Sequence, residues 1–413
     1  MLDNTKTLSD RPRLLSSVTE ALGFGAALEN MAESAAAREN ATELPHDAMA
    51  ELKALGFGAL RLPIEQGGNG LSLTDLFAVA RDLAAADSNL AHAFRNHSWQ
   101  VELALRNASH PMHARVLELT GQGKTVGLSF VETDVIAAGA PRGRVLARLL
   151  WDEDGRVYRG SGDKVYATGN IYNDAFVGIA VEDRSGDTVQ YIVERGEGVG
   201  TDDDWKGFGQ RLTGSGTARF RDAPVPLSQV YPLDPPTRGA AAPWRFTFHQ
   251  VWLTNCIAGV VRRIALDAVD LLRKRGRNFY HGSVGHPTEE PVLQQQLGRI
   301  RAYAASVEAT MDRAVARLQL GWDAYGGDAE HDAMLAATLA AAEAKVVIDD
   351  LAPQIASWLI DLGSGSVVSR DNAFDRHWRN IKVIASHNPR LYKEQLLGRH
   401  QLTGSTPPTG AFF

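Results

Sequence analysis

The spacing of apolar and polar positions divides the chain into three stretches. From about Leu14 to Leu119 the apolar residues recur at helical spacing, in Ala-rich runs such as AMAELKALGF and DLFAVARDLAAADSNLAHAF, with one Gly-rich break, EQGGNG. Between Val126 and Tyr231 they form short β-rich runs separated by Gly, Asp and Pro, which is typical of antiparallel strands. After the Pro-rich run PLDPPTRGAAAP the helical spacing returns, and it predicts helices over Phe246–Lys274, Val292–Leu320, His331–Leu362 and near Asn372–Ser386.

This order predicts an α+β fold that is mainly α. We expect an N-terminal helical domain over 1–123, a central antiparallel β domain over 124–234 and a C-terminal four-helix bundle over 235–413. A small β domain between two helical domains leaves clefts where three surfaces meet, and such junctions commonly bury small ligands.

Composition and charge change this picture little. The 413 residues are 44% hydrophobic and 22% charged, and 43 basic against 49 acidic residues give a net charge of -6. That balance gives no reason to expect nucleic acid or an anionic membrane as partner, which leaves a small-molecule substrate. One cysteine, no signal-like start and no long apolar run predict a cytoplasmic protein that does not enter a membrane.

Glycines mark one turn in the N-terminal region. Gly67, Gly68 and Gly70 precede a predicted helix whose cap is Ser72 or Thr74. No GxGxxG follows a strand and no GxxxxGK[ST] occurs, so a tightly held nicotinamide dinucleotide is not expected.

The segment AHAFRNHSWQ carries candidate acid/base chemistry. His92 and Asn96 are four residues apart, which puts them on one face of a helix, whereas His97 points elsewhere. His92 is a candidate for proton transfer if that face lines a pocket, and a structural histidine otherwise. The segment lacks the glutamate and the third ligand of a zinc site, so no metal is expected.

Two further segments suit a planar ligand. In KVYATGN, Thr168 and Gly169 end a predicted strand, where a hydroxyl and an exposed amide can bind the edge of a heterocycle; a plain strand end is the alternative. Trp205 is a candidate stacking wall.

Near the C-terminus, FDRHWRNIKVIASHNPRLYKEQ forms a basic helix that Pro389 should interrupt. Its arginines could bind phosphate and His387 could face a reacting centre, or the segment could be a solvated amphipathic helix end. Cys256 lies in the apolar run NCIAGVV, which indicates a buried thiol rather than a nucleophile.

The order of domains, together with LPIEQGGNGLS, RLTGSGTARFRDAPVP and FDRHWRNIKV, closely resembles the acyl-CoA dehydrogenase superfamily over essentially the whole chain. The resemblance implies a flavin-binding fold and a homotetramer. It departs from the dehydrogenases at two functional places: the position of their catalytic glutamate falls on Asn388, and their threonine-glutamate-proline turn is replaced by FVETDVIAAGAPRG.

These departures resemble the flavin-dependent monooxygenase branch, most nearly the dibenzothiophene monooxygenase type. In that branch a histidine matches His92, a strand-end hydroxyl matches Thr168, an indole matches Trp205 and a histidine followed by a polar residue matches His387 with Asn388. Two substrate-pocket positions differ, because Asn96 replaces a tyrosine and Ile384 a histidine.

The branch implies a two-component oxidoreductase. A separate NAD(P)H:flavin reductase supplies reduced FMN (or FADH2), and this chain uses it with O2, through a C4a-hydroperoxyflavin, to oxygenate a small sulfur-, nitrogen- or aromatic-containing substrate. By this resemblance Thr168 and Gly169 contact the flavin ring near N5, His387 and Asn388 stabilise the peroxide, and His92 positions substrate or moves a proton. Arg277 is the first candidate for the flavin phosphate, with Arg370 from a neighbouring subunit as the second.

Two alternatives remain at this point. One is an acyl-CoA dehydrogenase or oxidase with tightly bound FAD and a relocated base. The other is a catalytically silent member of the superfamily that acts as an oligomeric binding protein.

Overall fold

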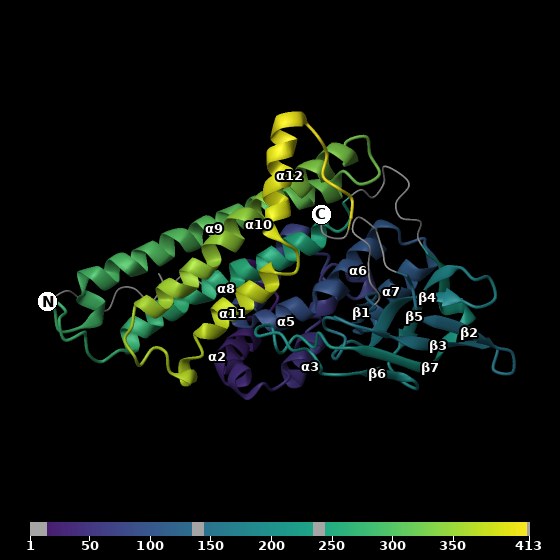
Figure 1. Ribbon diagram of the computed structural model, residues 1–413, viewed down its shortest axis with the longest axis horizontal. Coiled ribbons are helices and arrows are strands. Elements are labelled where there is room, and N and C mark those ends of the chain that lie inside the picture. The colour runs from purple at the N-terminus through teal and green to yellow at the C-terminus, as the bar shows by residue number, and fades with distance from the viewer. Residues whose placement is uncertain (1–14, 134–143, 234–243, 411–413) are drawn as a thin grey trace.

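The computed structural model describes residues 15–133, 144–233 and 244–410. A helical region, a sheet and a second helical region follow one another along the chain, and the long helices of the second region extend away from the sheet (Figure 1). This arrangement confirms the predicted fold class, α+β and mainly helical. None of the described helices combines the length and the apolar character needed to cross a membrane.

The first helical region ends before the sheet begins. Its Gly-rich turn is tight, because a Cβ on Gly68 would lie 2.2 Å from the Leu62 carbonyl oxygen. Ser72, rather than Thr74, caps the next helix by accepting a hydrogen bond of 3.0 Å from the Asp75 amide. The helices are α1 (Ser17–Ala21), α2 (Gly25–Ala41), α3 (His46–Ala54), α4 (Leu73–Ala86), α5 (Ser88–Ala93), α6 (Arg95–Arg106) and α7 (Pro111–Gly121), with 3-10 turns η1 (Phe57–Ala59) and η2 (Ile64–Gln66).

The predicted single helix around His92 is interrupted. Helix α5 ends at Ala93 and α6 begins at Arg95, with Phe94 between them. His92 and Asn96 therefore lie on two short helices, and the expectation that they share one helical face is corrected. Both side chains nevertheless reach loops between strands of the sheet, His92 at Gln210 and Asn96 at Thr168.

The sheet is mixed rather than purely antiparallel. In the described chain the strand order is β6-β7-β3-β2-β4-β5-β8, with β1 also on β4. Strand β4 pairs in parallel with both β1 and β2, and the other pairings are antiparallel. The strands are β1 (Val126–Ser129), β2 (Arg148–Asp152), β3 (Val157–Lys164), β4 (Ala175–Glu182), β5 (Thr188–Glu194), β6 (Val199–Thr201), β7 (Ala218–Pro226) and β8 (Val230–Pro232), with η3 (Leu227–Gln229) before the last.

A buried ion pair anchors the sheet. Lys164 at the end of β3 is fully buried; its ammonium pairs with Glu132 and donates to the Ile179 carbonyl at 2.8 Å. Glu132 also accepts from the Ala147 amide at 3.0 Å. The unusual segment FVETDVIAAGAPRG thus begins with a structural carboxylate, while its residues 134–143 lie outside the described residues.

The second helical region contains the predicted bundle and one additional helix. The basic helix already ends at Ala385, before Pro389, which instead is the N-cap of a new helix, α12, that the sequence interpretation omitted. The helices are α8 (Thr247–Lys274), α9 (Pro291–Asp323), α10 (Glu330–Asp361), α11 (Asp375–Ala385) and α12 (Arg390–Thr403), with 3-10 turns η4 (Pro287–Glu289) and η5 (Arg370–Asn372).

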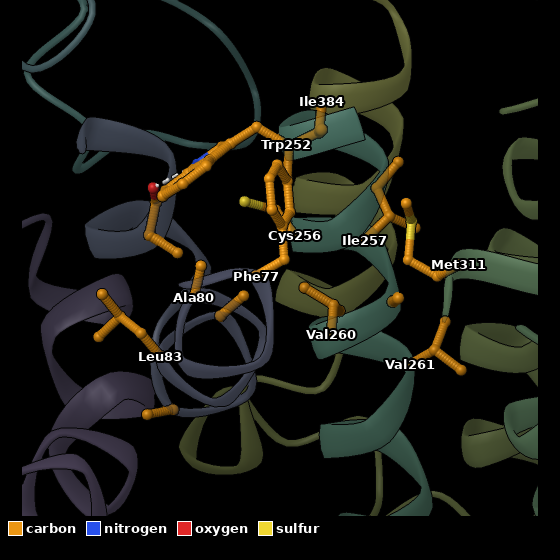
Figure 2. Close-up of a cluster of buried hydrophobic side chains, with 14 of the residues drawn as sticks. Phe77, Ala80, Leu83, Trp252, Cys256, Ile257, Val260, Val261, Met311 and Ile384 are labelled. Atoms are coloured by element: carbon orange, nitrogen blue, oxygen red, sulfur yellow. Dashed lines mark hydrogen bonds between the residues drawn. The ribbon is translucent and has the colours of Figure 1, made fainter. Parts of the chain in front are cut away.

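Helix α8 connects the two helical regions because it packs on α4 as well as on the bundle (Figure 2). Gly259 permits this close approach, since a Cβ there would lie 2.6 Å from the Arg81 carbonyl oxygen. Trp252 of the same helix donates a hydrogen bond of 2.9 Å to the Ala91 carbonyl of α5. Cys256 is buried as predicted, and burial raises its pKa to about 12, so the thiol stays protonated. These contacts fix α5 against α8.

Candidate functional site

Polar side chains from three segments meet where α5 and α6 face α8 and the chain after α11. Burial, followed by the positive charge of Arg95, lowers the pKa of His249, on α8, and of His387, after α11, and His92 interacts electrostatically with both rings. Such mutual electrostatic influence requires proximity. The structure therefore brings together two predicted residues, His92 and His387, with two that sequence reasoning missed, Arg95 and His249.

His92 is held as a neutral ring with one free nitrogen. Its Nδ1 lies 2.9 Å from Gln210 Oε1, and the Gln210 amide donates to Ser88 Oγ at 2.9 Å, which leaves the oxygen to accept from Nδ1–H. Burial and the positive charge of Arg95 lower the His92 pKa to about 3. The buried Nε2 therefore carries a lone pair at neutral pH, and it has no hydrogen-bond partner in the described chain.

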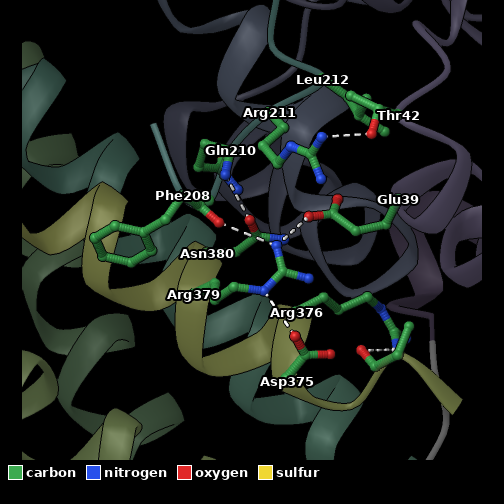
Figure 3. A network of polar contacts seen from close by, with 12 residues as sticks. Glu39, Thr42, Phe208, Gln210, Arg211, Leu212, Asp375, Arg376, Arg379 and Asn380 are labelled. Carbon is green, nitrogen blue, oxygen red and sulfur yellow. Dashed lines mark hydrogen bonds and ion pairs between the residues drawn. The ribbon is translucent and has the colours of Figure 1, made fainter. Parts of the chain in front are cut away.

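A polar network fixes Gln210, and through it His92 (Figure 3). The backbone N–H of Gln210 donates a hydrogen bond of 2.6 Å to Asn380 Oδ1 of α11. Next to Asn380, the Arg379 guanidinium pairs with buried Glu39 of α2 at 3.1 Å and donates to the Phe208 carbonyl at 3.0 Å. Arg379 thus has a structural role here. The basic helix positions the site rather than presenting a row of free cations.

Thr168 and Gly169 lie next to α5 and α6, although they follow β3 rather than end it, since that strand stops at Lys164. Asn96 donates to the Thr168 carbonyl at 3.1 Å. Thr168 Oγ1 accepts from Ser215 Oγ at 3.0 Å, so its own proton can point at a ligand. Gly169 has φ +82°, and a Cβ there would lie 2.3 Å from the Ala93 carbonyl oxygen.

The second catalytic candidate pair lies in the turn between α11 and α12. Asn388 is buried; its amide donates to Gln250 Oε1 of α8, and its Oδ1 has no partner among the described residues. The ring of His387 is open to solvent, yet its pKa is lowered well below the ordinary value by surrounding protein and by nearby positive charges.

Ile384, predicted to line the substrate pocket, lies in the buried core beside Trp252 and Cys256 (Figure 2). Its side chain is 1% exposed. The position therefore faces the packed interior between α8 and α11.

Aromatic side chains cover the outer side of the Gln210 segment. Trp205 is half-buried, its indole N–H donates to the Gly209 carbonyl at 3.3 Å, and Tyr166 meets it edge-on. Phe208 stacks on Trp378 of α11. Tyr166, Phe208 and Trp378 are 66%, 56% and 42% exposed. A group of exposed aromatic rings commonly marks a surface that binds a ligand or another protein.

The two predicted phosphate-binding arginines lie elsewhere. Arg277 follows the far end of α8, and 25 helical residues separate His249 from Lys274, which corresponds to roughly 40 Å. Arg370 lies beside the end of α2, where its carbonyl accepts from Asn40 at 2.6 Å. Both side chains are exposed, and neither forms a hydrogen bond or ion pair with the described residues. A single chain therefore does not bring Arg277 to the His92 site.

His97 has a structural role, as its predicted orientation implied. It accepts from the Val126 amide at Nδ1, at 3.0 Å, and its Nε2 lies 2.9 Å from the Gly58 carbonyl. It therefore joins the first strand to the N-terminal helices. Two residues of the basic helix α11 also have structural partners. His377 Nε2 lies 2.7 Å from the Asp267 carboxylate, and Arg376 lies 3.5 Å from the same group.

Arg95 and His249 are the residues that the sequence interpretation overlooked. Arg95 is 6% exposed, and its Nε and Nη1 have no hydrogen-bond partner among the described residues. His249 stacks against Trp99 and also leaves a ring nitrogen, Nδ1, unpartnered within the described chain. One signal was present in the sequence: an arginine inside the otherwise apolar and neutral stretch that surrounds His92.

These features suit a flavin. Isoalloxazine presents donors and acceptors on its edge and a flat apolar face, and the site offers the Thr168 hydroxyl, unpartnered atoms of His92 and Asn388, and exposed rings around Trp205. Buried polar atoms without partners are rare in folded proteins and commonly mark a ligand site.

Two family models match the chain. Residues 25–124 match the acyl-CoA dehydrogenase N-terminal domain, and residues 251–389 match the acyl-CoA dehydrogenase C-terminal domain. Among similar proteins, a probable FMNH2-dependent monooxygenase, SfnC of Pseudomonas putida, is 26% identical over 91% of this chain and 93% of its own length. The dibenzothiophene monooxygenase of Rhodococcus erythropolis is 27% identical over 87% of each chain.

Solved structures show the same fold. TdsC from Paenibacillus sp. A11-2, in complex with FMN and indole, superposes with a TM-score of 0.83 at 22% identity, over 96% of this chain and 100% of that one. Methanesulfinate monooxygenase MsuC from Pseudomonas fluorescens superposes with a TM-score of 0.81 at 23% identity, over 97% of this chain and 100% of that one.

Proposed function

The chain belongs to the acyl-CoA dehydrogenase family, and from this membership we propose that it is a two-component flavin-dependent monooxygenase. It takes reduced FMN from a separate NAD(P)H:flavin reductase and uses O2 to oxygenate a small substrate. We propose a sulfur compound as the first choice, because dibenzothiophene and methanesulfinate appear in the names of similar proteins. The cytoplasm is the proposed location.

The observation that carries this proposal is the absence of a basic carboxylate at position 388, together with the polar atoms of the site that have no partner in the described chain. Position 388 holds an amide where the dehydrogenases hold a base, and Asn388 Oδ1 has no partner in the described chain. Abstraction of an α-proton requires a basic group, whereas oxygen chemistry on a flavin requires hydrogen bonds and exclusion of water. These needs favour a monooxygenase over a dehydrogenase.

Bound reduced flavin supplies the electrons that activate O2. The chain's own residues would hold and shield it, with the Thr168 hydroxyl free to donate to its ring edge and Trp205 available to pack against the ring. Neutral His92, fixed through Gln210, presents Nε2 to accept a hydrogen bond or a proton. Asn388 Oδ1 would accept a hydrogen bond, and His387, an exposed residue, would exchange a proton with solvent.

The experiment is anaerobic mixing of the purified protein with photoreduced FMN, followed by stopped-flow addition of oxygenated buffer. We expect an absorbance transient that lasts much longer than with free flavin before oxidised FMN appears. Changing His92 or His387 to Ala should shorten it by about 100-fold or more, as for loss of a proton-transfer group.

The matched control is His331→Ala, which removes an exposed ring that packs on Trp244. This variant should behave as the wild type does. Immediate reoxidation of both FMN and FAD by the wild type would overturn the proposal, and bleaching of bound FAD by an acyl-CoA would establish the dehydrogenase alternative instead.

We also propose that the flavin phosphate is bound by Arg277 of a second copy, in a homotetramer. The separation of roughly 40 Å along α8 supports this, because Arg277 cannot reach the Thr168 site within one chain. Arg277→Ala and His92→Ala variants, each inactive alone, should regain part of the activity when co-expressed, because mixed assemblies contain one site with both wild-type residues. Absence of any recovery in assemblies that contain both variants would contradict a shared site.

A further inference from the structure

Arg95 differs from the other buried arginines that the structure describes. Arg81 is paired with Asp312 at 2.7 Å, and Arg376 lies 3.5 Å from Asp267. Arg95 is equally buried, at 6% exposed, yet its Nε and Nη1 find no hydrogen-bond acceptor and no carboxylate pairs with it in the described part of the chain.

An unpaired buried guanidinium is costly. Transfer of a charge out of water costs several kcal/mol even after the protein relaxes, and a partner ion or hydrogen bonds normally offset that cost. Burial lowers the pKa of Arg95 to about 10, and the neighbouring Cys256 thiol, which stays protonated, offers no negative charge to offset this. Arg95 therefore remains charged at neutral pH, and nothing in its described surroundings neutralises it.

The surroundings of Arg95 suit an anion. Three imidazoles, those of His92, His249 and His387, lie near enough for its charge to lower their pKa values. Two of these rings carry buried nitrogens without partners within the described residues, His92 Nε2 and His249 Nδ1. The cluster opens to solvent at His387. An anion beside Arg95 would meet one full positive charge and could accept a hydrogen bond from His249 in its Nδ1–H tautomer, whereas His92 Nε2, which carries a lone pair, would offer no donor.

We propose that Arg95 is a substrate-binding residue that binds an oxyanion of the substrate, a carboxylate or a sulfur oxyanion, on the side of the cluster where His249 lies. The inference rests on the proposed monooxygenase function, because only that function makes the bound anion a substrate. It narrows the substrate class to organic anions. Guanidinium binds carboxylate and sulfur oxyanions through paired N–H donors, and such charge-assisted hydrogen bonds are strong inside a protein.

Isothermal titration of the full chain with two pairs of probes tests the inference. Each pair compares an anion with a neutral analogue of similar shape: methanesulfinate with dimethyl sulfoxide, and benzoate with benzamide. The wild type should bind one of the anions at least tenfold more tightly than its neutral analogue, and the pair that discriminates identifies the sulfur or the carboxylate source. Equal binding of both members of both pairs would overturn the inference.

Three variants separate binding from folding. Arg95→Met removes the charge at similar length and should abolish the preference for the anion, while Arg95→Lys should retain part of it. Arg317→Met, at an exposed position of α9, is the matched control and should keep the wild-type preference. Arg95→Met should also unfold at the same or a higher temperature, because a buried unpaired charge is replaced by an apolar group. A marked loss of stability, with anion preference intact in the Lys and Met variants alike, would assign Arg95 a structural role instead.

The flavin experiment distinguishes the two proposals. A long-lived transient in the wild type without anion preference would leave the monooxygenase function standing and refute the role of Arg95. Anion preference that depends on Arg95, without any transient, would support the anion site and refute the monooxygenase function.

Discussion

The close contact between Gly169 and α5 allows the segment proposed to face the flavin to be perturbed at one defined point. Gly169→Ala forces a side chain into a left-handed conformation, φ +82°, and places its Cβ 2.3 Å from the Ala93 carbonyl oxygen. Gly186→Ala, in the turn between β4 and β5, has nearly the same backbone, φ +78°, but its Cβ would meet nothing within 4 Å. The pair therefore separates backbone strain from steric overlap.

The magnitudes follow from these two geometries. The left-handed conformation costs about 1–2 kcal/mol in each variant. The overlap with Ala93 adds about 1–3 kcal/mol to Gly169→Ala alone. The reduced freedom of the unfolded chain, about 0.4–1 kcal/mol, applies to both variants and cancels in the comparison. For a chain of this length that unfolds as one unit, 1 kcal/mol corresponds to about 1 °C in Tm.

We therefore expect Gly169→Ala to unfold about 1–3 °C below Gly186→Ala in differential scanning calorimetry. Because Thr168 must move with Gly169, we also expect FMN affinity to fall about tenfold, which corresponds to about 1.4 kcal/mol. FMN fluorescence titration measures this, and Gly186→Ala should bind FMN as the wild type does. Equal Tm losses together with equal FMN affinities would refute the argument that this contact positions the segment.

Three further predictions concern the frame around the site. Lys164→Met should destabilise the protein by about 3–5 kcal/mol because it leaves Glu132 buried without its partner, whereas adding Glu132→Gln should recover part of the loss, as measured by denaturant unfolding. Stability should fall as the pH drops below about 6.5, because burial holds the pKa of His97 and of His377 at about 4 and the unfolded chain takes up these protons first; a Tm that stays constant from pH 6.5 to 4 would contradict this. Ser72→Ala should cost about 1 kcal/mol through loss of the α4 cap, and Thr74→Ala much less in the same unfolding assay.

The sequence predicted the elements of the fold more closely than their pairing. Helical spacing placed α8, α9 and α10 within a few residues of their observed ends, since long amphipathic periods are strong signals. It did not reveal that β4 pairs in parallel with β1 and β2, because pairing partners are set by long-range contacts rather than by local pattern. Helix α12 was missed because Pro389 was interpreted as an end and not also as a beginning.

The candidate site was predicted in part for the same reason. Family resemblance pointed to His92, Thr168 and Asn388, but their partners, Gln210 for His92, Ser215 for Thr168 and Gln250 for Asn388, come from distant segments. Arg95 was passed over because an arginine at the start of a helix normally faces water, and its burial results from packing against α8 that no local pattern records.

Beside the break at Phe94, the adjacent residues Arg95 and Asn96 contact different parts of the site. Asn96 reaches Thr168, next to the proposed flavin, while Arg95 lies among the imidazoles of α8 and the turn after α11. A replacement at position 95 leaves the contacts of His92 with Gln210 and of Asn96 with Thr168 in place. In evolutionary terms, a single substitution at position 95 can change substrate specificity while the residues proposed to contact the flavin stay the same. Related enzymes can therefore acquire new substrates through this position.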